Sequence, residues 1–90
     1  MMADMKPAEV QNAVVRTLRQ RIEEINRQLT EIARNQEYFE KKYGLKTEQF
    51  YEKFLKGEMG DDMDFLEWKA SKELYDEQKR QRDLLLEAIR

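Results

Sequence analysis

Residues 7–43 contain no glycine, and their apolar residues follow a seven-residue repeat. Steps of alternately three and four place both positions of the repeat on one helix face, the pattern of a coiled coil. At 1.5 Å per residue, a helix of this length extends for roughly 55 Å. A chain of 90 residues builds no core that long, so the helix needs a partner helix along most of its length. We call this face the heptad seam; its two lines are Val15, Ile22, Leu29, Gln36 and Tyr43, and Leu18, Ile25, Ile32 and Phe39.

Two further helices are expected after the first. Pro7 suits a first helical turn, where its missing N–H costs nothing, and Gly44 suits a helix end. Residues 47–56 predict a short helix with Thr47 as its N-cap, ended by Gly57. Its apolar residues are spaced four apart on one face, as Phe50 with Phe54 and Tyr51 with Leu55.

A third helix is expected over residues 62–89. Asp64 with Glu67 resembles a capping box, and Asp61 or Asp62 are alternative caps. Its apolar residues gather at its two ends: Phe65, Trp68, Leu74 and Tyr75, then Leu85, Leu86 and Ile89. The sequence therefore predicts an all-α fold, a disordered N-terminus over residues 1–6, and one helical domain over residues 7–90. In that domain the long third helix folds back on the long, coiled-coil-like first helix (about 7–43) as a helical hairpin.

The composition argues against several functions. Charged residues make up 40% of the chain, against a usual ~25%, which fits long, solvated helices. Cysteine and histidine are absent, which removes thiol chemistry, disulfides, the commonest general base and the commonest metal ligand. We expect no enzyme activity, no metal and no cofactor. No apolar run approaches the ~18 residues of a membrane span and the start is no signal peptide, so a cytoplasmic protein is expected.

The heptad seam allows two interpretations that are compatible with each other. It packs against the third helix within the chain, or it pairs with a second copy. The length of the first helix and the polar Gln36 at a seam position, which resembles a residue that sets register, favour a homodimer or higher oligomer. The residues expected in that contact are Leu18, Ile22, Ile25, Leu29 and Ile32.

The turn "KGEMGDDMDFLEW", Lys56 to Trp68, carries five acids and no base between Gly57 and Glu67. The spacing is not that of an EF-hand loop. Capping and the positive end of the helix dipole account for one or two acids. The others predict contact with a basic surface of another protein, on a turn held rigid by aromatic packing around Phe65 and Trp68. We call these residues the acidic turn: Glu58, Asp61, Asp62, Asp64 and Glu67.

Nucleic-acid binding is not expected. The net charge of −2 provides no general attraction to nucleic acid. Arginines do follow the first helix, but acids such as Glu23, Glu24 and Glu31 lie among them, and no helix-turn-helix pattern accompanies them. A solvated helix face is the simpler interpretation of Arg16, Arg19, Arg21, Arg27 and Arg34.

The segment "YFEKKYGLKTEQFYEKFLKGEMGDDMDFLEWKASKELY", Tyr38 to Tyr75, resembles the small antitoxins encoded beside toxins of the TumE kind in bacteria and archaea. The resemblance is in the Tyr-Gly helix end, the short "FYEKF" helix, Gly-Glu-x-Gly-Asp-Asp and the aromatic-Trp helix start. It covers under half of the chain. It implies an all-helical antitoxin that neutralises a protein toxin by direct binding, and it assigns no contact residue. A structural or adaptor coiled-coil dimer without a toxin, or a DNA-binding regulator, are the alternatives.

Overall fold

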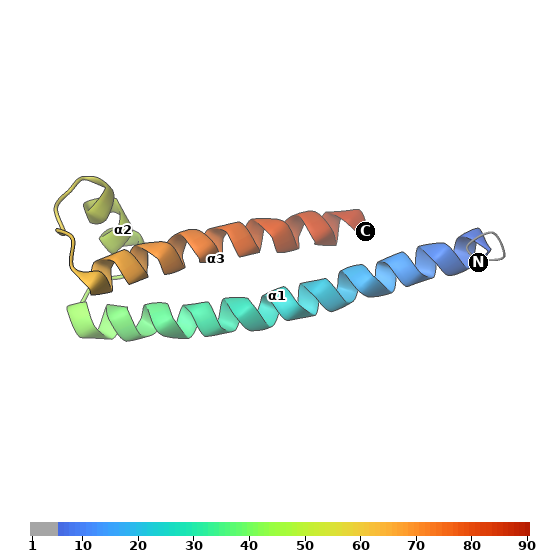
Figure 1. Cartoon of the computed structure of the whole chain (residues 1–90), viewed down its shortest axis with the longest axis horizontal. Helices are drawn as coiled ribbons and strands as arrows, with labels where there is room; N and C mark the ends of the chain where they lie inside the picture. Colours follow the sequence, from blue (N-terminus) through green and yellow to red (C-terminus); the bar gives the residue numbers. More distant parts are fainter. Residues whose placement is uncertain (1–5) are drawn as a thin grey trace.

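The computed structural model describes residues 6–90, which form an antiparallel hairpin of two long helices with a short helix at its closed end (Figure 1). The helices are α1 (Pro7–Tyr43), α2 (Thr47–Leu55) and α3 (Met63–Ala88). The molecule measures 60 × 22 × 21 Å. The expected all-α hairpin is thus confirmed. The expectation of disorder over residues 1–6 falls mostly on residues 1–5, which lie outside the described residues.

The predicted helix limits are close to those of the structure. The range 7–43 for α1 is confirmed, whereas α2 ends one residue before the predicted 47–56. The third helix was expected over 62–89, and α3 lies one residue inside both limits. Gly44 ends α1 in the left-handed conformation, at φ 67°, and its N–H donates to the carbonyl of Glu40. Gly57 and Gly60, at φ 76° and 78°, shape the connection from α2 to α3, because such φ values strain any residue with a Cβ.

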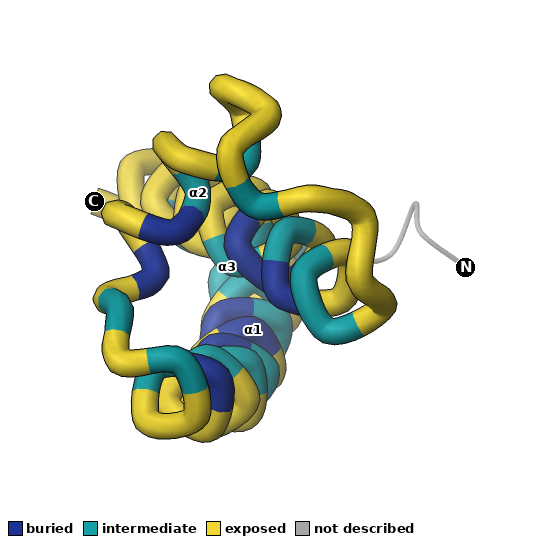
Figure 2. The backbone as a smooth tube through the Cα atoms, turned by 90° about the vertical axis from the view of Figure 1, so that its left-hand side faces the viewer, coloured by how far each residue is buried: buried dark blue, intermediate teal, exposed yellow. Residues whose placement is uncertain are grey.

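The core has two parts along the hairpin. Between α1 and α3 it is narrow, and the α1 residues buried there are Ile22, Ile25 and Leu29. At the closed end, Phe39, Phe50 and Trp68 from the three helices form a buried aromatic cluster. Viewed from that end, the buried segments lie where the three helices face one another, and most of the backbone that faces outward is exposed (Figure 2). None of the helices described is long and apolar enough to cross a membrane.

Trp68 lies at the centre of the aromatic cluster. Its ring stacks on Phe50 with 3.9 Å between centroids and 7° between planes, and Phe39 stacks on it at 5.6 Å. Phe65 lies 5.8 Å from Phe50 and Phe54 lies 5.7 Å from it. The expected packing of the third helix's start on the short helix is therefore confirmed. Each such aromatic pair adds about 0.5–1.5 kcal/mol beyond area burial.

The expected role of Thr47 as an N-cap is wrong. Thr47 is the first residue of α2, and Lys46 occupies the cap position. The Thr47 hydroxyl accepts a hydrogen bond from Trp68 Nε1 at 3.0 Å and donates to Glu40 Oε2 at 2.9 Å. Its N–H donates to the same carboxylate oxygen at 2.8 Å. Glu40 on α1 thus serves as the acceptor that a capping side chain would normally supply.

The hairpin is uneven in length. With 37 and 26 residues, α1 and α3 extend for about 55 Å and about 39 Å. Because their closed ends are level, the N-terminal part of α1 continues beyond the C-terminus of α3 (Figure 1).

We expect Trp68→Ala to lower the free energy of unfolding by roughly 3–5 kcal/mol, because it leaves a large cavity in the aromatic cluster. It also leaves the Thr47 hydroxyl without its donor. Urea unfolding followed by circular dichroism measures the change. The control is Leu66→Ala, two residues away on α3 and 43% exposed, where a loss below about 1 kcal/mol is expected. Equal losses in both variants would contradict a core centred on Trp68.

Candidate partner-binding site

Asp62 is the residue of the acidic turn that caps α3. Its carboxylate accepts a hydrogen bond from the N–H of Asp64 at 2.9 Å, and its carbonyl accepts the N–H groups of Phe65 and Leu66. The sequence allowed three aspartates as the cap of α3, and the structure shows that Asp62 is the one. The capping box of Asp64 with Glu67 is wrong, because α3 begins at Met63 and Asp64 already lies within the helix.

Asp64 instead joins the start of α3 to the end of α1. Its Oδ2 lies 2.7 Å from Lys42 Nζ and 2.5 Å from the hydroxyl of Tyr43. These hydrogen bonds, first from Lys42 and then from Tyr43, lower the pKa of Asp64 below its ordinary value of 3.8. The same bonds to Asp64 raise the pKa of both Lys42 and Tyr43. Asp64 is therefore a structural residue.

Three acids of the turn remain free. Glu58, Asp61 and Glu67 are exposed, and their side chains form no hydrogen bond or ion pair among the described residues. The same segment exposes three apolar side chains, namely Leu55 at 62%, Met63 at 75% and Leu66 at 43%. We call these six residues the docking end. They lie at the closed end of the hairpin, which faces the viewer in Figure 2.

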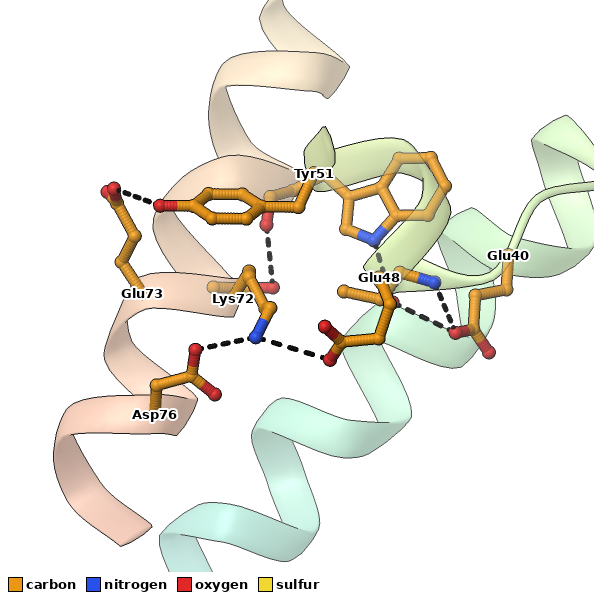
Figure 3. A network of polar contacts seen from close by, with 9 residues as sticks. Glu40, Glu48, Tyr51, Lys72, Glu73 and Asp76 are labelled. Atoms are coloured by element: carbon orange, nitrogen blue, oxygen red, sulfur yellow. Dashed lines mark hydrogen bonds and ion pairs between the residues drawn. The ribbon is translucent and has the colours of Figure 1, made fainter. Parts of the chain in front are cut away.

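A second polar network fastens the start of α2 to α3 (Figure 3). The Lys72 ammonium lies 3.2 Å from Glu48 on α2 and 2.5 Å from Asp76 on α3, and its side chain is only 10% exposed. Burial lowers the pKa of Lys72, but its hydrogen bonds to Asp76 and Glu48 outweigh this, so the pKa is raised. Tyr51 packs under this ammonium, 5.5 Å from it.

Sequence reasoning missed Lys72. The only signal in the sequence is the spacing of Lys72 and Asp76, four apart on a helix. That spacing is common on exposed faces and does not distinguish a buried lysine. The contact from Glu48 depends on how α2 folds back onto α3, which no local pattern encodes.

The structure places the expected dimer residues mainly inside the hairpin. Ile22, Ile25 and Leu29 are buried within the single chain, whereas Leu18 and Ile32 are half-buried. The homodimer stays a prediction, but three of its five expected contact residues are already covered by α3. The contact between α1 and α3 also includes partly buried glutamine side chains, from Gln28 and Gln36 on α1 and Gln78 on α3.

Within residues 6–90 no group of three or more acidic side chains is placed to hold a metal ion. The hollows found on the surface are open; one of about 440 Å³ adjoins Lys72 where the three helices meet. Comparison with protein-family models, curated proteins and solved structures found no match to this chain.

We expect Asp64→Asn to destabilise the protein in a way that depends on pH. Because the folded-state pKa of Asp64 is lowered, its contribution is fully present above the unfolded pKa near 4. It is lost as the pH falls through the folded value. The difference in unfolding free energy between wild type and Asp64→Asn should therefore be largest near neutral pH and vanish in strong acid.

Chemical denaturation at a series of pH values measures this difference. Asp61→Asn is the matched control, since Asp61 lies in the same turn but has no hydrogen-bond or ion-pair partner among the described side chains. Its unfolding free energy should follow that of wild type throughout. A pH-independent loss in Asp64→Asn would mean that its bonds to Lys42 and Tyr43 do not stabilise the ionised form.

Proposed function

We propose that this protein is an antitoxin-type binding protein that neutralises a small toxin by direct contact through its docking end. The observation that carries the proposal is that the carboxylates of Glu58, Asp61 and Glu67 form no hydrogen bond or ion pair among the described residues. Asp62 and Asp64, in the same turn, are used by the fold, so the remaining charges have no structural duty. Free acids beside exposed apolar side chains are suited to a partner with basic groups around an apolar centre.

The support beneath the docking end favours binding over a flexible acidic tail. Trp68 stacks on Phe50, Asp64 is bonded to α1, and Lys72 joins α3 to α2. These contacts hold α2 and the start of α3 in place before any partner arrives. A surface that is already ordered loses less conformational entropy on binding, so even a small contact area yields useful affinity.

The two kinds of side chain at the docking end have separate duties in this proposal. Leu55, Met63 and Leu66 supply apolar area that becomes buried on binding, which sets the dissociation rate. The three acids attract and orient a basic partner, which mainly sets the association rate. The resemblance of Tyr38–Tyr75 to antitoxins indicates a toxin that acts on RNA, whose active face carries basic residues to hold phosphates.

The proposal is tested with the products of the two genes that flank the gene for this chain. Each is expressed alone and together with the full chain. One of them should arrest growth when alone, lose that effect when co-expressed, and elute with the chain as one complex. If neither product is toxic and neither binds, the antitoxin assignment is wrong and a coiled-coil adaptor becomes the better account, favoured by the projecting part of α1.

In the resulting complex, we expect Glu58→Gln/Glu67→Gln to reduce the association rate constant several-fold at low salt and to weaken its dependence on ionic strength, with little change in folding. Adding Asp61→Asn should slow association further. Stopped-flow or surface-binding kinetics at several salt concentrations measure the effect.

The matched control is Glu23→Gln/Glu31→Gln, two exposed glutamates on α1 away from the docking end. It removes the same net charge, so it corrects for the total field of the molecule. The association rate constant should fall clearly further in Glu58→Gln/Glu67→Gln than in the control. If they slow association equally, the acids act only through net charge and the contact surface lies elsewhere.

A further inference from the structure

The docking end continues along α3 as a row of exposed apolar side chains. Met63, Leu66, Ala70 and Leu74 follow one another at steps of three and four residues. At about 100° per residue, these side chains lie within a sector of about 80°, on the side of α3 opposite Trp68. Met63, Leu66 and Leu74 are 75%, 43% and 49% exposed, and Ala70 is exposed too. We call these four residues the α3 stripe.

The α3 stripe has a clear limit at each end. It begins in the acidic turn, and beyond Leu74 the same side of α3 carries the exposed polar residues Glu77 and Gln81. From Met63 to Leu74 the stripe extends for about 17 Å, or about three helical turns. Exposed apolar side chains that gather in one place mark contact surfaces, and the limited length of this one indicates a partner segment of similar length.

We propose that the α3 stripe binds an amphipathic helix of the partner, about three turns long, antiparallel to α3 and with basic residues in its last turn. This inference rests on the proposed function, because it names the part of the partner that the docking end receives. It also adds Ala70 and Leu74 to the contact surface.

The backbone of α3 explains why the bound segment is a helix. Beyond the first turn of α3, the backbone N–H and C=O groups along the stripe are hydrogen-bonded within the helix. A partner strand laid on the stripe would therefore find no backbone group to pair with, and burying its own unpaired groups costs free energy. A helix satisfies its backbone groups internally, and its side-chain ridges fit between side chains spaced three and four residues apart.

The unpaired acids gather at one end of the α3 stripe. Glu58, Asp61 and Glu67 have no ion-pair partner among the described residues, and they belong to the turn from which the stripe begins. Glu67 is four residues from Met63 and three from Ala70, so its carboxylate adjoins the stripe itself. At the other end the acids are paired within α3, as Glu73 with Lys69 and Glu77 with Arg80. A partner therefore meets a negative charge mainly where the stripe begins.

This asymmetry favours one orientation of the bound helix. Basic residues are most favourable in the last turn of a helix, where they interact with the negative end of its dipole. A helix antiparallel to α3 places that last turn beside Glu67 and the rest of the acidic turn. Its apolar residues then continue along the stripe toward Leu74.

Substitution of Leu74 tests the stripe in the complex that the flanking-gene experiment yields. Leu74→Glu places an unpaired carboxylate in the buried contact and should raise the dissociation constant about thirtyfold or more. Leu84→Glu is the matched control, since Leu84 is 57% exposed on the same helix, beyond the stripe. The control should bind within about threefold of wild type. Isothermal titration calorimetry measures binding, and circular dichroism verifies that both variants keep their helix content.

The outcomes separate this inference from the proposed function. If Leu74→Glu binds like Leu84→Glu while Glu58→Gln/Glu67→Gln still slows association, the docking end binds the partner but the helix contact is wrong. If neither flanking gene product binds the chain, both proposals are wrong.

Photo-crosslinking tests the helix and its direction. In separate samples p-benzoylphenylalanine replaces Met63 or Leu74, and mass spectrometry locates the linked residue of the partner. An antiparallel helix predicts two links in one segment, about eleven residues apart, with the link from position 63 nearer the C-terminus of the partner. An extended strand would place the two links about five residues apart, and a parallel helix would reverse their order. Either of these results, or links in two separate segments, would overturn the proposal.

Discussion

The buried indole of Trp68 is the contact on which the closed end of this molecule depends. It stacks on Phe50 of α2 and Phe39 of α1, and its Nε1 donates to Thr47, whose hydroxyl in turn donates to Glu40. One side chain of α3 thus contacts both other helices through apolar and polar groups. The nine residues of α2 are too few for an independent helix, so α2 exists because Trp68 and its neighbours hold it in place.

Stability must therefore fall from one end of the hairpin to the other. The closed end has aromatic packing, the Asp64 contact and the Lys72 network. In the middle, α1 and α3 share a narrow apolar contact whose buried α1 residues are Ile22, Ile25 and Leu29. The start of α1 lies beyond the C-terminus of α3 (Figure 1), and no residue of α1 before Ile22 is fully buried among the described residues. Opening fluctuations should begin at the N-terminal end of α1 and reach Trp68 last, so the docking end is the part that keeps its shape.

The main elements of the fold could be predicted from the sequence because the residues that begin, end and orient each helix lie within or next to that helix. The heptad repeat, Gly44 and Gly57 gave the helices nearly to the residue, and Phe50 with Trp68 indicated the closed core. The errors concern side chains whose partners are distant in sequence. Thr47 was expected to cap α2, but Trp68 and Glu40 use its hydroxyl. Asp64 was one of three candidate caps of α3, but Lys42 and Tyr43 bind its carboxylate. Local patterns cannot reveal such contacts, because they form only once the hairpin closes.

The division among the acids of the turn links fold to function. An exposed carboxylate that already has a cationic partner gains little from a second one, whereas a free carboxylate keeps its full field for a binding partner. By this criterion the fold uses Asp62 and Asp64 and leaves Glu58, Asp61 and Glu67 for recognition.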